Sequence, residues 1–478
     1  MKGEQKDAPR RAAPRAVTVL FVAVCAVCCV VPSVGMIWAP TTTTTENREL
    51  AEVPQLVSDG VVNEAYLSDW GTWFEDHFAY RNELISLNAE LYATVLGVST
   101  TDTVVVGTDG WLYYAGTLSD YCGWNELSDR AIDNIAFNLS LMQGYVQAFG
   151  ASFVVTFAPN KNTLYDEDMP YYYAASAQES NLDRLLAALD AEGVNYVDTE
   201  ALFEEQDEVL YYLRDTHWNT KGALLACEEL LSGLGLSTLA LPLYELEAEV
   251  VDDYVGDLNS MLYPTTATPE TDYSYDAGLM WEMAQGESVE DSAIVATGEG
   301  SGTLLMYRDS FANNMIQFLA YVFETSYYTK LVPYDLTLVG STGADAVIIE
   351  RAERNLDDLS TDPAIMPAPS VSIADVVLPD EVGQGNVSIE EDGTYLVVTG
   401  DLPEEYRDED ADIYLGVESA DGTVTWYVPF HVSTDESDYG YKAYFRASTL
   451  EDAQAVWVAC TSGDEVVCVD CVSINSAQ

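Results

Sequence analysis

The sequence predicts an α/β protein with a parallel sheet, followed by an all-β sandwich domain and preceded by one transmembrane helix. Three observations support this fold class. Short apolar strands alternate with amphipathic helices between residues 128 and 359, helical periodicity stops after Pro369, and residues 16–40 form an uncharged run behind a basic flank. Nearly all-apolar strands that alternate with helices are typical of a parallel sheet covered on both faces. Ligands of such sheets bind at the carboxyl ends of the strands.

The composition excludes two classes of protein. The chain has 478 residues, of which 48% are hydrophobic and 11% aromatic. This is enough apolar material for buried cores in about two or three domains, and it excludes a mainly disordered chain. The 19 Lys and Arg residues oppose 80 Asp and Glu residues, which gives a formal net charge of −61. Such a chain repels the phosphate backbone, so nucleic acid is excluded as a partner.

Residues 1–40 are expected to form a cytoplasmic basic flank and a signal-anchor or transmembrane helix. A basic flank before about 20 apolar residues holds its own end in the cytoplasm, so the chain after Pro40 is predicted to be extracytoplasmic. The alternative is a cleaved signal and a secreted protein, for which Ser33-Val34-Gly35 has the small-x-small form of a cleavage site. The basic residues of the flank are Lys2, Lys6, Arg10, Arg11 and Arg15.

Two parts of different character follow the predicted anchor. Residues 41–100 begin with the five threonines Thr41 to Thr45, a stalk above the membrane, and continue as a helical segment over 63–96 that breaks near Ala79. Residues 101–366 hold the α/β units, and their stretch from 241 to 302 lacks clear elements and is expected to wall an active site. The predicted strands are 104–106, 111–114, 152–157, 194–197, 303–307, 326–329 and 346–350. The predicted helices are 128–149, 177–192, 220–234 with Thr220 as N-cap, 311–321 and 352–359.

Residues 370–478 are predicted to form a β-sandwich, because short apolar strands alternate with turns there. Tyr414, Trp426 and Tyr427 could stack on sugar faces and make this part a carbohydrate-binding module, although aromatic residues at strand spacing more often pack in a core. The predicted strands are 371–373, 386–389, 395–398, 413–417, 423–428, 442–445, 455–459 and 466–469.

The cysteines and histidines do not form a metal-binding pattern. No C-x-x-C motif pairs with another at zinc spacing, and the chain has only 3 histidines, so neither a metal nor another cofactor is expected. Cys25, Cys28 and Cys29 lie in the apolar run. In an oxidising compartment, Cys460 could form a cross-strand disulfide with Cys468 or Cys471.

Histidine is the side chain best suited to act as a general base near neutral pH, so the choice of base is narrow. His77 and His431 are expected to be structural. His217 lies in Asp215-Thr216-His217, directly before a predicted helix. Residues two apart can point the same way in an extended or turning segment, so Asp215 can accept a hydrogen bond from the imidazole and fix its tautomer. A D-x-H motif alone is weak support for catalysis.

Ser310 is the candidate nucleophile. It follows the predicted strand 303–307 and precedes a predicted helix, which raises its hydroxyl at the carboxyl edge of the sheet beside backbone N–H groups that can bind an oxyanion. On its own, Ser310 could equally be an N-cap residue. Together with Asp215 and His217 in the same sheet architecture, a Ser-His-Asp triad becomes the better hypothesis.

Several motifs in one order give the chain a family resemblance. It resembles the SGNH hydrolase superfamily, and its order of Asp, His and then Ser resembles the AlgX/AlgJ-type polysaccharide O-acetyltransferases and the related DHHW proteins. One departure is Arg308, where many relatives have Gly before Asp-Ser. The matching pieces are Glu46-Asn47-Arg48-Glu49-Leu50, the aromatic helix ending at Arg81, Val106-Gly107-Thr108-Asp109-Gly110-Trp111-Leu112, Ala158-Pro159-Asn160-Lys161, Asp215-Thr216-His217-Trp218-Asn219, Gly256-Asp257-Leu258 and Arg308-Asp309-Ser310-Phe311.

The resemblance implies an SGNH-hydrolase-like three-layer α/β/α sandwich for residues 101–366, with a triad of Ser310, His217 and Asp215. It implies transfer of an acetyl group through acetyl-serine to hydroxyls of a cell-surface or secreted polysaccharide, with a membrane-bound O-acyltransferase as partner. The alternatives are a carbohydrate acetylesterase and a non-catalytic glycan-binding or assembly protein. The dense negative charge favours a neutral or amino-sugar polymer over a strongly acidic glycan.

Overall fold

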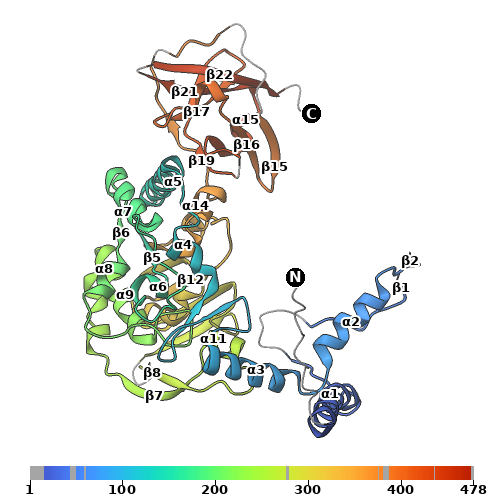
Figure 1. The fold of residues 1–478 in the computed structure, drawn as a ribbon. Helices are drawn as coiled ribbons and strands as arrows, with labels where there is room; N and C mark the ends of the chain where they lie inside the picture. The colour runs from blue at the N-terminus through green and yellow to red at the C-terminus, as the bar shows by residue number, and fades with distance from the viewer. Residues whose placement is uncertain are drawn as a thin grey trace, which may run out of the picture. The chain divides into compact units, whose positions relative to one another are not determined.

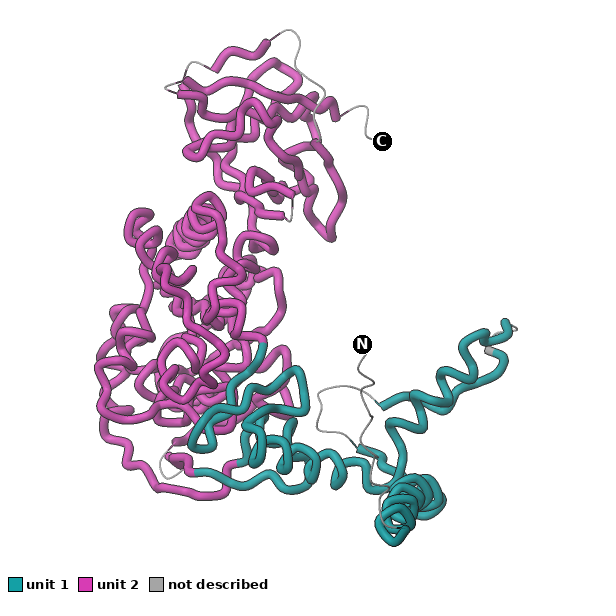
Figure 2. The backbone as a smooth tube through the Cα atoms, viewed as in Figure 1, with its two compact units in different colours: residues 1–115, 255–270 teal, residues 116–254, 271–478 magenta. Residues whose placement is uncertain are grey.

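The structure is a computed structural model that divides the chain into two compact units, residues 1–115 with 255–270 and residues 116–254 with 271–478 (Figure 2). It describes residues 15–43, 50–58, 61–275, 279–374, 376–379, 387–434, 436–463 and 465–474. The predicted positions that lie outside the described residues are Lys2, Lys6, Arg10, Arg11, Thr44, Thr45, Glu46, Asn47, Arg48, Glu49 and Asn386.

The first unit begins with an apolar helix. Helix α1, Arg15–Gly35, is 21 residues long, and it is the one helix in the described ranges that is long and apolar enough to cross a membrane. A helix of this kind near the N-terminus fits either a signal or a single-pass anchor.

The helical segment that follows is broken where the sequence predicts. Helix α2, Tyr66–His77, and helix α3, Arg81–Leu96, are separated because Tyr80 adopts a left-handed conformation with φ of 63°. Helix α3 ends at Gly97, whose φ of 65° is typical of a C-terminal glycine. A two-stranded pairing of β1, Val57–Ser58, with β2, Val61–Val62, precedes these helices.

A small hydrophobic cluster completes the first unit. Strands β3, Val104–Val106, and β4, Leu112–Tyr114, form the predicted hairpin, and its turn places Asp109 and Gly110 at positive φ. Helix α11, Asp257–Leu262, packs on the hairpin and on α3. The buried residues that join them are Ala89, Val104, Leu112, Leu258 and Leu262.

The second unit is built on a seven-stranded sheet with the order β6-β5-β13-β11-β12-β10-β9. Figure 1 labels three of these strands, β5, β6 and β12. The pairs from β6 to β12 are parallel, as predicted, whereas β10 and β9 pair antiparallel. The sheet is therefore mixed. The bounds are β5 Ser152–Ala158, β6 Tyr196–Val197, β9 Trp281–Gln285, β10 Ala293–Gly298, β11 Thr303–Tyr307, β12 Thr325–Thr329 and β13 Ala346–Ala352.

The two antiparallel strands lie in the stretch that was predicted to lack clear elements. Along β10, buried Ile294 and Ala296 alternate with more exposed residues, and β9 is partly to fully exposed. A strand with one solvent-exposed face alternates apolar and polar residues, so it lacks the all-apolar run that identifies a buried parallel strand. The same stretch also holds β7, Glu249–Tyr254, which pairs with β8, Glu270–Ser274.

Helices cover both faces of the sheet and make a three-layer α/β/α sandwich. Val154, Leu304 and Ile348 share one buried cluster with residues of α9 and α12, whereas Phe153, Leu305 and Val347 share the opposite cluster with residues of α5 and α7. Neighbouring residues of each strand thus alternate between the two cores. The helices are α4 Leu118–Cys122, α5 Asp129–Ala148, α6 Lys161–Leu164, α7 Asn181–Glu192, α8 Thr199–Glu204, α9 Thr220–Gly233, α10 Ser237–Ala240, α12 Ile316–Val322, α13 Leu338–Thr342 and α14 Asp358–Thr361.

Three local predictions need correction. The N-cap of α9 is Asn219 rather than Thr220, because the Asn219 side chain accepts hydrogen bonds from the N–H groups of Lys221 and Gly222. The predicted helix over 352–359 is wrong: β13 continues to Ala352, and only a 3₁₀ turn and the short α14 follow. Strand β13 pairs with β5 along its whole length, and these long-range bonds override local helical periodicity. The predicted helix over 311–321 begins as a 3₁₀ turn, Phe311–Met315, before α12.

Two antiparallel sheets pack face to face after residue 369, as predicted for a β-sandwich. Their orders are β14-β18-β17-β21-β22 and β15-β16-β20-β19, and inward residues of both sheets share one core. Trp426 is buried and Tyr427 packs edge-on against Phe445, so both rings contribute to packing. The bounds are β14 Ser370–Val371, β15 Ser388–Asp392, β16 Tyr395–Asp401, β17 Ile413–Ser419, β18 Val424–Tyr427, β19 Phe430–Val432, β20 Gly440–Arg446, β21 Ala453–Ser462 and β22 Glu465–Ser473; β19 was not predicted.

The predicted disulfide does not form, and all eight cysteines are free thiols. The register of β21 with β22 explains this result. Cys460 lies opposite Val467, whereas Cys468 lies opposite Ala459 and so faces the other side of the sheet. Cys471 lies opposite Trp457, farther along β21.

A buried polar contact joins the β-sandwich to helix α5. The Asn138 side chain donates to the His431 carbonyl at 2.8 Å and accepts from the His431 N–H at 2.9 Å. Arg130 donates to Nδ1 of His431 at 3.3 Å and to the Ala411 carbonyl at 2.8 Å. The Phe137 ring stacks on the imidazole with centroids 4.2 Å apart. His431 therefore has a structural position, away from Ser310.

We expect His431 to make folding stability depend on pH. Burial, and secondarily the charge of Arg130, hold the pKa of His431 well below its usual 6.5. The unfolded chain binds this proton below about pH 6.5 and the folded chain does not, so the free energy of unfolding should fall by about 1.4 kcal/mol for each pH unit below that value. Urea denaturation between pH 5.5 and 7.5 should show a steeper loss in wild type than in His431→Phe. Equal slopes would mean that the folded protein protonates His431.

Candidate active site

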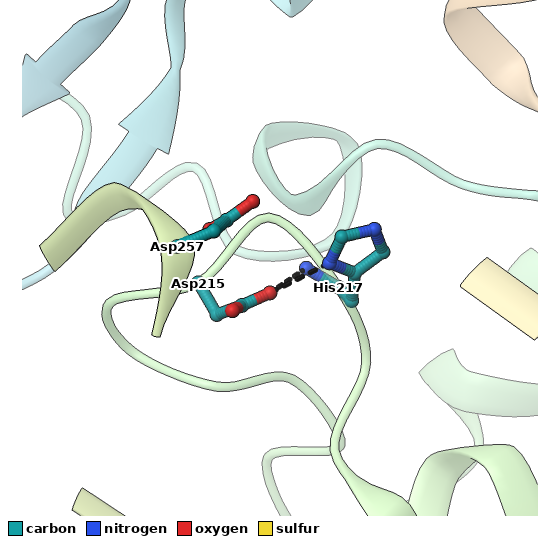
Figure 3. A group of neighbouring side chains, drawn as sticks. All are labelled: Asp215, His217 and Asp257. Carbon is teal, nitrogen blue, oxygen red and sulfur yellow. Dashed lines mark hydrogen bonds and ion pairs between the residues drawn. The ribbon is translucent and has the colours of Figure 1, made fainter. Parts of the chain in front are cut away.

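The structure brings Asp215, His217 and Ser310 into one hydrogen-bonded chain. Nε2 of His217 lies 2.8 Å from Oγ of Ser310, and Nδ1 lies 2.7 Å from Oδ1 of Asp215. Figure 3 shows the second of these bonds; Asp257, also labelled there, belongs to the other unit. The Asp215 side chain is buried, whereas 20% of the His217 side chain is exposed. An imidazole between a hydroxyl and a buried carboxylate can take the hydroxyl proton and return it.

Ser310 is placed by the central strand of the sheet. Strand β11 ends at Tyr307 between parallel β13 and β12, so Ser310 lies at the carboxyl edge. Ser310 is the N-cap of the 3₁₀ turn Phe311–Met315, but its side chain makes no capping bond. Its hydroxyl contacts Nε2 of His217 instead. Ser310 is therefore not simply a residue that caps the turn with its side chain.

The Asp309 carboxylate fixes the turn that carries Ser310. Its Oδ1 accepts from the Phe311 N–H at 2.9 Å, and its Oδ2 accepts from the Ala352 N–H at 2.7 Å. The Asp309 N–H donates to the buried Glu350 at 2.9 Å. Burial and the neighbouring Asp309 charge raise the pKa of Glu350 well above its usual value. The Phe311 N–H is thus engaged, whereas the Ser310 N–H makes no hydrogen bond to any described residue.

Arg308, the departure from the usual Gly-Asp-Ser pattern, is buried beside this turn. Its guanidinium donates to the Asp309 carbonyl at 3.1 Å and to Oδ1 of Asn313 at 2.5 Å. It also donates to the carbonyls of Val289 and Asp291 at 2.7 and 3.1 Å. Burial lowers the pKa of Arg308 from its usual value. The arginine therefore connects the segment before β10 to Asp309 and Asn313, which lie before and after Ser310 in the chain. A glycine at this position has no side chain that could make these contacts.

The segment that carries Asp215 and His217 is held by a buried lysine. The Nζ atom of Lys161 donates to the carbonyls of Tyr212, Leu213 and Asp215 at 3.1, 3.1 and 2.6 Å. Three carbonyl acceptors satisfy the three N–H donors of an ammonium group. Lys161 belongs to the Ala158-Pro159-Asn160-Lys161 motif, so the sequence contained a signal for this residue although not for its role.

Tyr254 holds the second oxygen of Asp215. Its hydroxyl donates to Oδ2 of Asp215 at 2.8 Å, and its ring stacks on Tyr212 with centroids 3.9 Å apart. Oδ1 of Asp215 also accepts from the backbone N–H of His217 at 2.9 Å. Its bond with Nδ1 of His217 confirms that the side chains of these two residues, two apart, point the same way. Tyr254 lies in the acidic stretch without clear periodicity, where no sequence pattern could identify it.

Trp218 links the two motif segments directly. Its indole N–H donates to the Phe311 carbonyl at 2.8 Å, and Trp218 is completely buried. The Phe311 ring meets the His217 imidazole edge to face, with centroids 4.7 Å apart. The residues that follow His217 and Ser310 therefore pack together, which fixes the distance between the imidazole and the Ser310 hydroxyl.

A known family model matches the region that contains Asp215 and His217. Residues 104–292 match the family model of the SGNH hydrolase-like domain of the acetyltransferase AlgX. These residues are similar to that domain. The matched residues include Asp215 and His217 and end before Ser310. The match confirms the family resemblance that the sequence motifs predicted.

Three solved structures are similar to the chain. Bacillus cereus PatB1 aligns with a TM-score of 0.43 and 17% identity over 53% of this chain and 96% of that chain. A DHHW family protein from Eubacterium siraeum has a TM-score of 0.40 and 17% identity over 54% and 93% of the two chains. The O-acetyltransferase domain of Pseudomonas putida AlgJ has a TM-score of 0.37 and 18% identity over 53% and 92%. No curated protein sequence matches the chain.

Tyr254→Phe should slow the reaction of Ser310 with a fluorophosphonate probe. The change removes one hydrogen bond to a charged carboxylate, a contribution of about 1.5–3 kcal/mol of which a part acts on the imidazole, so we expect labelling to slow about tenfold. Mass spectrometry of the labelled peptide measures the rate.

Tyr212→Phe is the matched control for this experiment. It removes a hydroxyl from the stacked partner ring. That hydroxyl lies 3.4 Å from the Thr220 hydroxyl and accepts from Nδ2 of Asn314 at 3.4 Å, and it does not contact Asp215. We expect labelling at the wild-type rate. If both variants react equally fast as wild type, the hydroxyl of Tyr254 does not position Asp215.

Proposed function

We propose that the chain is an extracytoplasmic O-acetyltransferase that moves an acetyl group through acetyl-Ser310 to hydroxyls of a cell-surface or secreted polysaccharide. The observation that supports this most is the hydrogen-bonded chain from Asp215 through His217 to Ser310. It accompanies an AlgX-type acetyltransferase domain. In this proposal Ser310 is the nucleophile, His217 the general base and acid, and Asp215 the residue that orients the imidazole.

In the first half of the proposed reaction, Oγ of Ser310 attacks the carbonyl carbon of an acetyl donor. Nε2 of His217 takes the hydroxyl proton as the C–O bond forms, and Asp215 stabilises the resulting imidazolium through Nδ1. The tetrahedral intermediate carries its negative charge on the former carbonyl oxygen, and in this proposal the N–H of Ser310 donates to that oxygen. The intermediate then breaks the bond to the leaving group, which receives the proton from His217, and acetyl-Ser310 remains.

In the second half, a sugar hydroxyl attacks the acetyl carbon of acetyl-Ser310. His217 takes the proton of that hydroxyl, and the tetrahedral intermediate collapses by breaking the bond to Oγ of Ser310. The proton returns to Ser310, and the sugar leaves as an O-acetyl ester. If water takes the place of the sugar hydroxyl, the same steps give acetate, so acceptor binding decides between transfer and hydrolysis.

The location and the partners belong to the proposal. Helix α1 supports an attachment to the membrane with the acetyltransferase domain on the extracytoplasmic side. A membrane-bound O-acyltransferase as the source of acetyl groups rests on the family resemblance alone. A polysaccharide acceptor is supported by the AlgX-type domain.

Ser310→Ala should abolish acetyl transfer by the full chain. The loss of a triad nucleophile typically costs at least about a thousandfold in rate, whereas the partly buried hydroxyl adds little to packing. The measurement is release of the chromogen from p-nitrophenyl acetate by detergent-solubilised protein, with mass spectrometry of an added oligosaccharide acceptor.

Ser341→Ala, a change to an exposed serine of α13, serves as the control and should retain activity. Acetylated oligosaccharide supports transfer. Release of acetate alone under all acceptor conditions would contradict transfer and support the acetylesterase alternative. Equal activity of wild type and Ser310→Ala would exclude Ser310 as the nucleophile.

A further inference from the structure

Helix α3 carries a row of exposed apolar side chains on the side away from its buried residues, Ser86 and Ala89. Ala89 packs in the small cluster with the hairpin and α11, so this side of the helix is already occupied. The exposed residues are spaced three and four apart and therefore share one face. Contiguous exposed apolar patches mark surfaces that contact a protein or a membrane. We call this row the leucine face; it comprises Leu84, Leu87, Leu91 and Val95, which are 43, 63, 58 and 66% exposed.

The turn that leads into α3 is bonded to the end of the apolar helix α1. The N–H of Ala79, two residues before α3, donates to the Pro32 carbonyl in the last turn of α1 at 3.3 Å. A Cβ atom on Gly35, the last residue of α1, would lie only 2.6 Å from the Cβ atom of Ala79, so the two backbones approach as closely as a glycine allows. Beyond α1, the Thr41 hydroxyl donates to the Phe78 carbonyl at 2.9 Å. Helix α3 therefore begins beside the point where α1 ends.

This junction places α3 at a membrane surface if α1 crosses the membrane. The 21 residues of α1 span about 30 Å at 1.5 Å per residue, which matches the hydrocarbon core of a bilayer. The last turn of α1 then lies at the interface between lipid and water. Figure 1 shows α1 nearly along its axis, whereas α3 extends sideways from its end. A helix that extends sideways from a spanning helix runs along the bilayer surface rather than away from it.

The helix on the other side of the same turn has the composition of a membrane interface. Along α2, the rings of Tyr66 and Trp70 are 6.3 Å apart between centroids, and those of Trp70 and Trp73 are 5.1 Å apart. None of these three residues is buried. Trp and Tyr are enriched where a protein passes the headgroup level, because their rings are apolar at one end and polar at the other. The surroundings of α3 thus favour lipid over water.

The charges of the two helices indicate which kind of lipid contact is possible. Helices α2 and α3 together contain five Asp or Glu residues and a single Arg, Arg81. A polybasic surface binds anionic headgroups by electrostatic attraction, and these helices do not have one. An interfacial helix can also bind through the burial of its apolar face. The leucine face offers this second kind of contact, for which a neutral lipid is sufficient.

We propose that the leucine face of α3 lies in the extracytoplasmic leaflet of the membrane that α1 crosses, with its side chains among the acyl chains. The inference rests on the membrane attachment in the proposed function, and it adds a second contact with lipid that is separate from the spanning helix. The first unit is then held along the bilayer surface by two helices instead of being tethered by one.

A photoreactive side chain in place of Leu91 tests this contact. The full chain with Leu91→p-benzoylphenylalanine is reconstituted in vesicles of palmitoyl-oleoyl phosphatidylcholine and irradiated, and mass spectrometry of the α3 peptide detects lipid adducts. We expect about tenfold more adduct at this position than at Glu90→p-benzoylphenylalanine, because only the apolar face of an interfacial helix reaches the acyl chains. The yield should be the same at low and high salt, because the contact is apolar. Both side chains are exposed, so neither replacement disturbs the core.

Glu90 is the matched control because it is the neighbouring residue on the same helix and its side chain is turned about 100° from that of Leu91. Equal amounts of lipid adduct at the two positions, or none at either, would overturn the inference. A cross-link from position 91 to a second copy of the chain in place of lipid would overturn it in favour of a dimer. A cross-link to residues 116–254 or 271–478 of the same chain would show that the protein itself covers the leucine face.

A third position separates this inference from the attachment on which it rests. Val24→p-benzoylphenylalanine lies in the middle of α1 and should form a lipid adduct if that helix spans the bilayer. Adduct at position 24 without adduct at position 91 would retain the membrane attachment and reject the contact through α3. Absence of adduct at position 24 would reject the attachment and this inference with it, while the chromogen and acceptor assay with Ser310→Ala still decides on acetyl transfer.

Discussion

The candidate active site depends on one carboxylate, that of Asp309. By accepting from the N–H groups of Phe311 and Ala352, it joins the turn after β11 to the end of the neighbouring strand β13. A serine on an unsupported turn would sample many orientations, whereas this turn has its backbone bonded on both sides. Two further hydrogen bonds hold the backbone of Asp309. Its N–H donates to Glu350, and its carbonyl accepts from Arg308. The position of the Ser310 hydroxyl is therefore a property of the sheet edge rather than of a loop.

The imidazole is positioned by a separate set of contacts. Lys161 donates hydrogen bonds to three backbone carbonyls of the segment that carries Asp215, and the Tyr254 hydroxyl donates to the Asp215 carboxylate. Trp218 then ties this segment to the Phe311 carbonyl. The two halves of the site meet through packed rings, because the Phe311 ring contacts both His217 and Trp218.

The sequence could predict what is local, and it could not predict what depends on distant contacts. Asp215, His217 and Ser310 were identifiable because their residue types are suited to catalysis and because they follow periodic elements. Tyr254 is one of many tyrosines in an acidic stretch, and only the folded chain brings its hydroxyl to Asp215. Strands β9 and β10 were missed because half-exposed strands lack an all-apolar run, and the end of β13 was misread because pairing with β5 outweighs helical periodicity.

The contact between α5 and β19 limits which domains can replace the C-terminal β-sandwich in a gene fusion. Phe430, which follows the first strands of the β-sandwich, is buried in the hydrophobic core that α5, α7 and the central sheet share. His431 beside it is bonded on both backbone groups by Asn138. A genetic fusion that exchanged the C-terminal sandwich for another would remove a ring from the core of its neighbour. The two architectures must therefore evolve together, with Phe430 and its pocket as the feature that compatible partners have to preserve.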